Sequence, residues 1–261
     1  MSRSSGWGER ALLLAVVVFV GASTGSAQSG AVGGEWRTYG GDLGSTRYAA
    51  LDQINGNNFE GLEVVWRFGT SNLGPFPDFN YQATPLMIDG VLYTTAGSRR
   101  DVVSLDAATG EMLWMYRLDE GERGTNAIRR MSGRGVAYWT DGEGDERIFV
   151  VTIGYQLIAL DAKTGRPVSG FGSEGIVDLK QNNDQFIDPL TGEIGWNSAP
   201  VVARDVVIVG ASHRSGGAPP SRENVKGYIR GFDVRTGRRT WIFHTIPRPG
   251  EFGRDTWLND S

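Results

Sequence analysis

One short acidic motif recurs along the sequence and could do chemistry. Asp-x-x-Thr-Gly stands at Asp106, Asp161 and Asp233, with a glycine closing each copy. Repeated carboxylates could belong to an acidic active site. The same residue types also build tight turns, because Asp accepts hydrogen bonds from backbone N–H groups two or three residues on and Gly tolerates positive φ. We favour the turn, and therefore expect none of these three aspartates to be catalytic.

Other reactive side chains are few. The chain has 261 residues, no Cys, 2 His and a net charge of -4. The absence of Cys excludes a disulfide framework, thiolate catalysis and Cys-ligated metal. The negative charge gives no electrostatic support for nucleic-acid binding. His244 follows a strand pattern, and we expect it to be structural.

The elements that must position these residues are β-hairpins. Apolar or alternating runs flank each Asp-x-x-Thr-Gly turn, and segments 84–97 and 199–212 each read as a further hairpin around a polar two-residue turn. Two hairpins per unit give four strands, which is the composition of a propeller blade. The 38 glycines suit a turn-rich fold. The sequence therefore predicts an all-β chain, a β-propeller of four-stranded blades.

The N-terminus has the order of a secretory signal peptide. Arg3 and Arg10 precede a 12-residue apolar run, and small residues end at Ala27. The run is short for a membrane span of about 20 residues. We expect residues 1–27 to be a signal peptide cleaved near Ala27, and residues 28–261 to be an exported periplasmic or secreted domain. An uncleaved N-terminal anchor is the alternative.

Three longer segments carry a family resemblance. Residues 35–68, 133–139 and 227–237, together with the turn motif that ends in Trp, resemble stretches of the pyrroloquinoline-quinone (PQQ) dehydrogenases, on the glucose and alcohol dehydrogenase branches. The resemblance implies an eight-bladed propeller in chains of roughly twice this length. This chain would then be the N-terminal portion, about half of the ring. We expect a closing strand at residues 64–68 and about three to four blades, with truncation at the C-terminus.

The resemblance also implies an activity. Family members oxidise a sugar or alcohol hydroxyl by hydride transfer to PQQ beside a calcium ion, and pass electrons to a cytochrome or to membrane ubiquinone. Peripheral membrane association is left open. The alternative function is a non-enzymatic β-propeller scaffold or binding protein with a degenerate cofactor site. As a third possibility, the fragment alone binds nothing, because a partial ring leaves an open sheet edge.

The resemblance assigns cofactor contacts in the first half of the chain. Arg134 occupies the position of a PQQ-binding arginine, and Gln82 stands three residues before a Pro where the family has Glu or Gln. Asn197 aligns with a PQQ-binding Thr. An arginine fork suits the carboxylates of PQQ. Surface or loop polarity is the alternative interpretation for each residue.

Further candidates lie nearby. Ser212 falls near a family serine, and His213 lies in a loop that we expect to face the propeller axis. Arg130 replaces a histidine of the glucose dehydrogenase branch, and with Arg129 it could neutralise PQQ carboxylates. The family's acidic calcium ligand has no counterpart in the stretch HRSGG that follows Ser212. The catalytic aspartate and the other metal ligands are expected beyond residue 261, so no catalytic or metal-binding residue is named.

Overall fold

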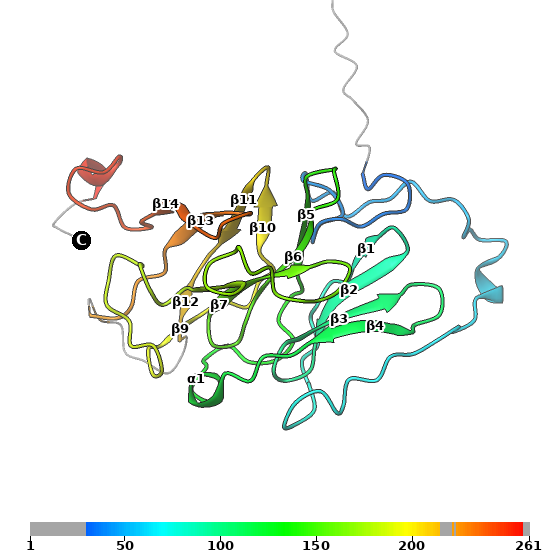
Figure 1. Cartoon of the computed structure of the whole chain (residues 1–261). Coiled ribbons are helices and arrows are strands. Elements are labelled where there is room, and N and C mark those ends of the chain that lie inside the picture. Colours follow the sequence, from blue (N-terminus) through cyan, green and yellow to red (C-terminus); the bar gives the residue numbers. More distant parts are fainter. Residues whose placement is uncertain (1–29, 215–220, 222, 258–261) are drawn as a thin grey trace, which may run out of the picture.

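The structure, a computed structural model, describes residues 30–214, 221 and 223–257. The predicted signal peptide lies outside these residues. The longer strands form three four-stranded antiparallel sheets, arranged side by side (Figure 1). None of the helices in the described ranges is long and apolar enough to cross a membrane.

Each sheet is one blade with its strands in chain order. Blade 1 consists of β1 (Leu86–Ile88), β2 (Val91–Ala96), β3 (Asp101–Asp106) and β4 (Met112–Tyr116). Blade 2 consists of β5 (Ala137–Thr140), β6 (Glu146–Val151), β7 (Gln156–Asp161) and β8 (Ile176–Asp178). Blade 3 consists of β10 (Val201–Ala203), β11 (Val206–Val209), β13 (Ile229–Asp233) and β14 (Arg239–Phe243). The predicted four-stranded blades are therefore confirmed.

Short elements lie outside the three blade sheets. The strands β9 (Ile194–Gly195) and β12 (Ser212–His213) pair with each other. The helix α1 (Gly121–Thr125) follows blade 1, and 3-10 turns occupy η1 (Phe59–Gly61) and η2 (Arg254–Thr256). The predicted site residues all lie outside the three blade sheets, and two of them, Ser212 and His213, form β12.

The Asp-x-x-Thr-Gly motif forms a turn in all three predicted copies. The Asp106 Oδ1 atom accepts hydrogen bonds from the backbone N–H of Thr109 (2.8 Å) and of Ala108 (3.0 Å), and from the Thr109 hydroxyl (2.8 Å). These bonds, led by the one from the Thr109 backbone, hold the pKa of Asp106 below its usual value. Asp161 and Asp233 bind Thr164 and Thr236 in the same way. The carboxylates are thus committed to the turn.

A fourth copy of the motif escaped the sequence analysis. Asp188 accepts bonds from Leu190 N–H (2.9 Å), Thr191 N–H (2.7 Å) and the Thr191 hydroxyl (2.8 Å). This copy lies in the loop between β8 and β9, not between two strands of a blade. The motif therefore specifies a turn, while the flanking apolar strands specify a blade.

A tryptophan from one unit docks on the turn of the next. The Trp114 indole N–H donates to the Ala162 carbonyl at 2.9 Å, and its ring covers Gly165. Trp66 repeats the arrangement on blade 1, with a 3.1 Å bond to the Ala107 carbonyl. The docked rings explain why the motif ends in glycine, because a Cβ at Gly165 would overlap the Trp114 ring.

The third turn is covered differently. Ser169 stands where the other copies have Trp, and the atoms that lie over Gly237 come from the Val177 and Phe171 side chains and from the backbone nitrogen of Gly172. Trp241, on the last strand of blade 3, is 39% exposed. The docking position therefore accepts other apolar side chains.

The segment expected to close the ring, residues 64–68, is not paired into a sheet in this chain. Residues 62–70 are described and contain no strand. The Trp66 and Phe68 side chains pack on blade 1, but no strand of the described chain pairs with the backbone of this segment, and a strand needs such a partner. Trp66 nevertheless docks as the end of a unit would. A role in ring closure stays a prediction.

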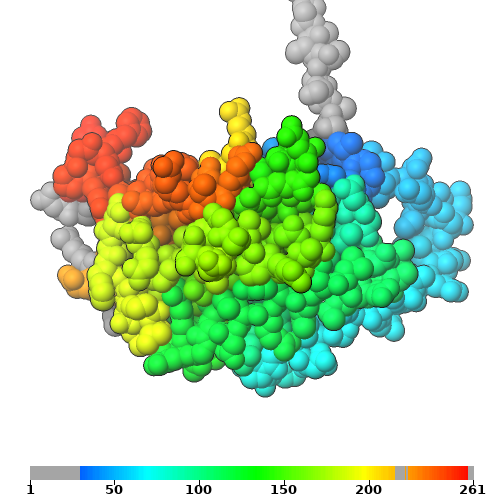
Figure 2. Space-filling view, viewed as in Figure 1, coloured from blue at the N-terminus to red at the C-terminus, as the bar shows by residue number. Residues whose placement is uncertain are grey.

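Blade 2 lies between two hydrophobic cores. One core joins it to blade 1 through residues such as Leu86, Val102 and Ile158. The other joins it to blade 3 through residues such as Phe149 and Phe232. The three blades consequently form one continuous body in the space-filling view (Figure 2).

Candidate functional site

The antiparallel order of the strands divides each blade into two ends. The Asp-x-x-Thr-Gly turns lie at one end, because they join the third and fourth strands. The opposite end, here called the loop end, contains the segments that enter the first strand, join the second to the third and leave the fourth. All the predicted site residues belong to the loop end: Gln82, Arg130, Arg134, Asn197, Ser212 and His213.

A buried arginine that the sequence analysis missed organises the loop end. Arg100, between β2 and β3, is 5% exposed. Its Nη2 atom donates to the Asn197 Oδ1 atom at 2.8 Å, and its Nη1 atom donates to the Trp196 carbonyl at 2.8 Å and the Val151 carbonyl at 2.9 Å. Segments of all three blades therefore meet on one guanidinium group, and Asn197 is one of its partners.

The same guanidinium holds the loop before blade 2. It donates to the backbone carbonyls of Arg129 and Met131, both at 3.1 Å. Burial lowers the pKa of Arg100 to about 10, so the group stays charged at neutral pH. Its hydrogen-bond partners are neutral oxygens rather than carboxylates. The loop end therefore contains a positive charge with no carboxylate bound to it.

A second group joins three predicted positions. The Arg129 Nε atom donates to the Ser212 hydroxyl at 3.2 Å, and its Nη2 atom donates to the His213 carbonyl at 3.2 Å. His213 is fixed by a 3.0 Å contact between Nδ1 and the Glu193 carbonyl. Its buried Nε2 atom has no hydrogen-bond partner among the described residues. Ser212, His213 and Arg129 thus form one polar cluster.

Gln82 and Arg134 lie on neighbouring loops. The Thr84 N–H donates to the Arg134 carbonyl at 3.2 Å, which brings the two entry loops together. Both side chains are exposed. Arg134 donates to the Tyr39 hydroxyl at 3.4 Å, and this bond lowers the pKa of Tyr39. Arg134 is therefore accessible to an anionic ligand.

Gly133 connects this pair to the buried arginine. A Cβ atom at Gly133 would lie 2.8 Å from the Arg100 Nε atom and 3.2 Å from the Asn197 carbonyl. Its φ of +68° also favours glycine. The predicted residues thus form a continuous set from Gln82 to Asn197.

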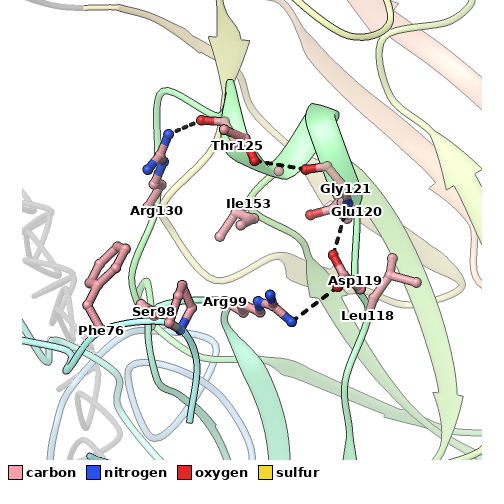
Figure 3. A pocket seen from close by; sticks show the side chains of 12 residues that line it. Phe76, Ser98, Arg99, Leu118, Asp119, Glu120, Gly121, Thr125, Arg130 and Ile153 are labelled. Carbon is pink, nitrogen blue, oxygen red and sulfur yellow. Dashed lines mark hydrogen bonds and ion pairs between the residues drawn. The ribbon is translucent and has the colours of Figure 1, made fainter. Parts of the chain in front are cut away.

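Arg130 does not join that set. It donates to the backbone carbonyls of Thr125 and Ala127 and lines a cavity of about 270 Å³ beside α1 (Figure 3). Glu120 lines the same cavity. It accepts bonds from the Thr152 hydroxyl (2.7 Å) and the Gly154 N–H (2.8 Å), and burial raises its pKa. The predicted role of Arg130 beside the other contacts gains no support from this geometry.

The polar groups of the loop end suit an anion better than a cation. Arginines and hydroxyl groups bind carboxylates well, and arginine does so with paired N–H donors. Among the described residues, no three His, Asp or Glu side chains gather as a metal site would require. The exposed Arg134 and the hydroxyl and amide groups of the loop end can therefore donate hydrogen bonds to an anionic ligand.

Comparison with known proteins decides the family. The profile of the glucose/ethanol/alcohol dehydrogenase β-propeller domain, a PQQ domain, matches residues 36–261. The chain belongs to the PQQ β-propeller family. The resemblance seen in the sequence is thereby confirmed.

Relatives on both branches of the PQQ family align with the chain. It is 32% identical over 234 residues to the dehydrogenase subunit of a quinone alcohol dehydrogenase from Gluconobacter oxydans, covering 88% of this chain and 27% of that one. It is 28% identical to a quinoprotein glucose dehydrogenase of the same organism, covering 85% and 29%. The crystal structure of quinohemoprotein alcohol dehydrogenase from Comamonas testosteroni superposes with a TM-score of 0.64 at 29% identity, covering 83% and 28%.

The chain therefore spans less than a third of these PQQ relatives. The sequence-based expectation of about half the family length is too high for them. A partial propeller of four-stranded blades is what the comparison and the structure share.

Proposed function

We propose that this chain supplies one wall of the PQQ site in an exported dehydrogenase that oxidises a sugar or alcohol hydroxyl. The observation that carries the proposal is the loop end itself, where Arg134, Asn197, Ser212 and His213 lie on one continuous set of loops in a chain of the PQQ family. When bound, PQQ would supply the hydride-accepting chemistry.

The residues of this chain would bind and orient the cofactor. Arg134 is exposed, and its guanidinium has N–H donors available for a carboxylate beyond the one that meets Tyr39. The Asn197 side-chain oxygen is occupied by Arg100, so its amide N–H groups are left to donate. Both groups therefore favour acceptor atoms on a ligand.

Partners and location extend the proposal. Electrons would leave to a cytochrome or to membrane ubiquinone, in keeping with relatives named as quinone-linked and quinohemoprotein enzymes. Export rests on the signal-peptide pattern of residues 1–27. N-terminal sequencing of the exported protein should find Gln28 first, and Met1 at the N-terminus would contradict cleavage. None of the residues named in this proposal is assigned to calcium.

PQQ titration of the full chain tests the cofactor proposal. We expect saturable quenching of tryptophan fluorescence together with a shift of the quinone absorbance in a calcium-containing buffer. Arg134→Gln should weaken binding about tenfold, since it removes the charge of a hydrogen-bonded pair, worth roughly 1.5–3 kcal/mol.

Arg235→Gln provides the matched control. Arg235 is also exposed, but it lies in an Asp-x-x-Thr-Gly turn at the opposite end of the blades, paired with Asp205. Its replacement should leave PQQ binding unchanged. An absence of saturable binding would contradict the proposal that this chain binds PQQ, and it would favour the two alternatives, a non-enzymatic propeller scaffold or a fragment that alone binds nothing.

A further inference from the structure

We infer that Arg100 is a positioning residue of the proposed cofactor site, holding Asn197 and the 129–135 loop in the arrangement that receives the ligand. The inference rests on the proposed function for its ligand, but its geometry is independent of it. No other residue in the described chain is so placed that segments of all three blades bond to one side chain at the loop end.

The geometry requires a guanidinium group. Arg100 donates to six groups that lie in different directions: the carbonyls of Met131, Arg129, Val151, Thr152 and Trp196, and the Asn197 side-chain oxygen. A planar fork with five N–H donors can satisfy such a set. A lysine has the same charge but only three donors on one atom, so it cannot reach all of them.

Arg100 also determines which way the Asn197 amide faces. Its 2.8 Å bond is made to Oδ1, and an arginine can only donate. The amide N–H groups of Asn197 must therefore point away from Arg100. Without this bond the amide could rotate and present its oxygen to a carboxylate ligand, which would repel it.

Burying the charged guanidinium of Arg100 costs desolvation free energy, which an uncharged residue at this position would not. Arg100 is 5% exposed and binds neutral oxygens, so no ionised partner offsets its desolvation through a direct contact. Glu120 and Asp78 act on Arg100 from a distance and offset part of this cost, and an anionic ligand at the loop end would offset more of it. Such an arginine behind a donor-rich surface is consistent with an anionic ligand at the loop end.

A second buried arginine in the chain provides a matched control. Arg230 is 1% exposed and donates to the Leu179 carbonyl (2.7 Å), the Gln181 carbonyl (3.3 Å) and the Tyr155 hydroxyl (3.2 Å), again without a bonded carboxylate. It does not contact Asn197. Arg230→Lys should therefore disturb the fold much as Arg100→Lys does, while leaving the site intact.

The first measurement needs no ligand. The full chain is labelled with 15N-asparagine and studied by NMR spectroscopy. The pair of signals from the Asn197 side-chain amide is assigned by its disappearance from the spectrum of Asn197→Ala. In Arg100→Lys we expect the chemical shifts of these two signals to move to those of a solvated, rotating amide. In Arg230→Lys they should stay unchanged. An unmoved Asn197 pair in Arg100→Lys would overturn the inference.

The second measurement is PQQ affinity, by the fluorescence titration described above. Arg100→Lys and Asn197→Ala should each weaken binding about tenfold, and the double variant should be no weaker than either single one, because both changes remove the same oriented donor. Additive losses would overturn the positioning role. Full affinity in Arg100→Lys would do so as well, since it would show that only the charge is needed.

The two proposals fail in different ways. If the unmodified chain binds no PQQ but the Asn197 pair responds as expected, the proposed cofactor is contradicted and the orientation of Asn197 by Arg100 is supported. If PQQ binds and the pair does not respond, the cofactor proposal stands and Arg100 is not its positioning residue.

Discussion

At the scale of single residues, the motif that first suggests an acidic active site is fully used by backbone hydrogen bonds. Asp106, Asp161, Asp188 and Asp233 each bind the Thr three residues on, through both its N–H and its hydroxyl. Two structural requirements explain the closing glycine of the blade turns. It adopts positive φ, and it leaves room for a docked aromatic ring.

Gly165→Ala tests those two requirements together. The φ of +68° and the close approach of the Trp114 ring both oppose a Cβ atom. We expect a loss of about 3 kcal/mol in the free energy of unfolding, roughly 1 from the backbone and about 2 from overpacking. Urea unfolding followed by circular dichroism measures it.

Gly142→Ala separates the backbone effect from the packing effect. Gly142 also has positive φ, at +78°, but a Cβ atom added there would meet no other atom within 4 Å. This variant should lose only about 1 kcal/mol. Equal losses in the two variants would show that the docked ring adds nothing.

At the scale of elements, the blades are joined by side chains that cross from one unit to the next. Trp66 and Trp114 each dock on the turn of the following blade through one indole hydrogen bond. Arg147 of blade 2 similarly donates to the Val234 and Arg235 carbonyls of blade 3, both at 2.9 Å. Neighbouring blades are therefore linked at the turn end by directional contacts as well as by apolar packing.

Trp114→Ala should weaken the junction between blades 1 and 2. Removing a half-buried indole with its 2.9 Å hydrogen bond should cost about 3 kcal/mol in the free energy of unfolding. Trp241→Ala is the control, because Trp241 occupies the equivalent strand position but is 39% exposed. It should cost about 1 kcal/mol. A larger loss at Trp241 than at Trp114 in the same urea titration would contradict the docking interpretation.

At the scale of the whole molecule, three blades share two cores, and blade 2 contributes to both. Strands β6 and β7 are buried along most of their length, whereas β14 contains no buried residue. Local opening costs most where buried apolar contacts are most numerous. Blade 2 should therefore be the most stable part of the chain.

Amide hydrogen exchange tests this ranking. The N–H groups of β6 (Glu146–Val151) and β7 (Gln156–Asp161) should exchange roughly tenfold or more slowly than those of β14 (Arg239–Phe243). Mass spectrometry of proteolytic fragments after timed deuterium labelling resolves the three strands. Uniform exchange across the blades would indicate a single cooperative unit instead.

The sequence by itself determined the all-β class, the hairpins, the Asp-x-x-Thr-Gly turns and the family. These features depend on residues close in sequence, where apolar alternation and turn chemistry act locally. The candidate cofactor contacts came from the family resemblance, and only the loop of His213 was expected to face the propeller axis. The strand expected at residues 64–68 did not form, because strand formation depends on a neighbour that local pattern cannot supply.

Only the tertiary structure decided which polar side chains meet. Arg99 and Arg100 are adjacent, yet Arg99 pairs with Asp119 at 3.3 Å while Arg100 is buried against Asn197, 97 positions away. Arg130, four positions before Arg134, turns towards α1 and leaves the predicted set. Burial and long-range hydrogen bonds arise from the packing of whole blades, which no local spacing encodes. The family was thus readable in the turns, and the organisation of the site became visible only around Arg100.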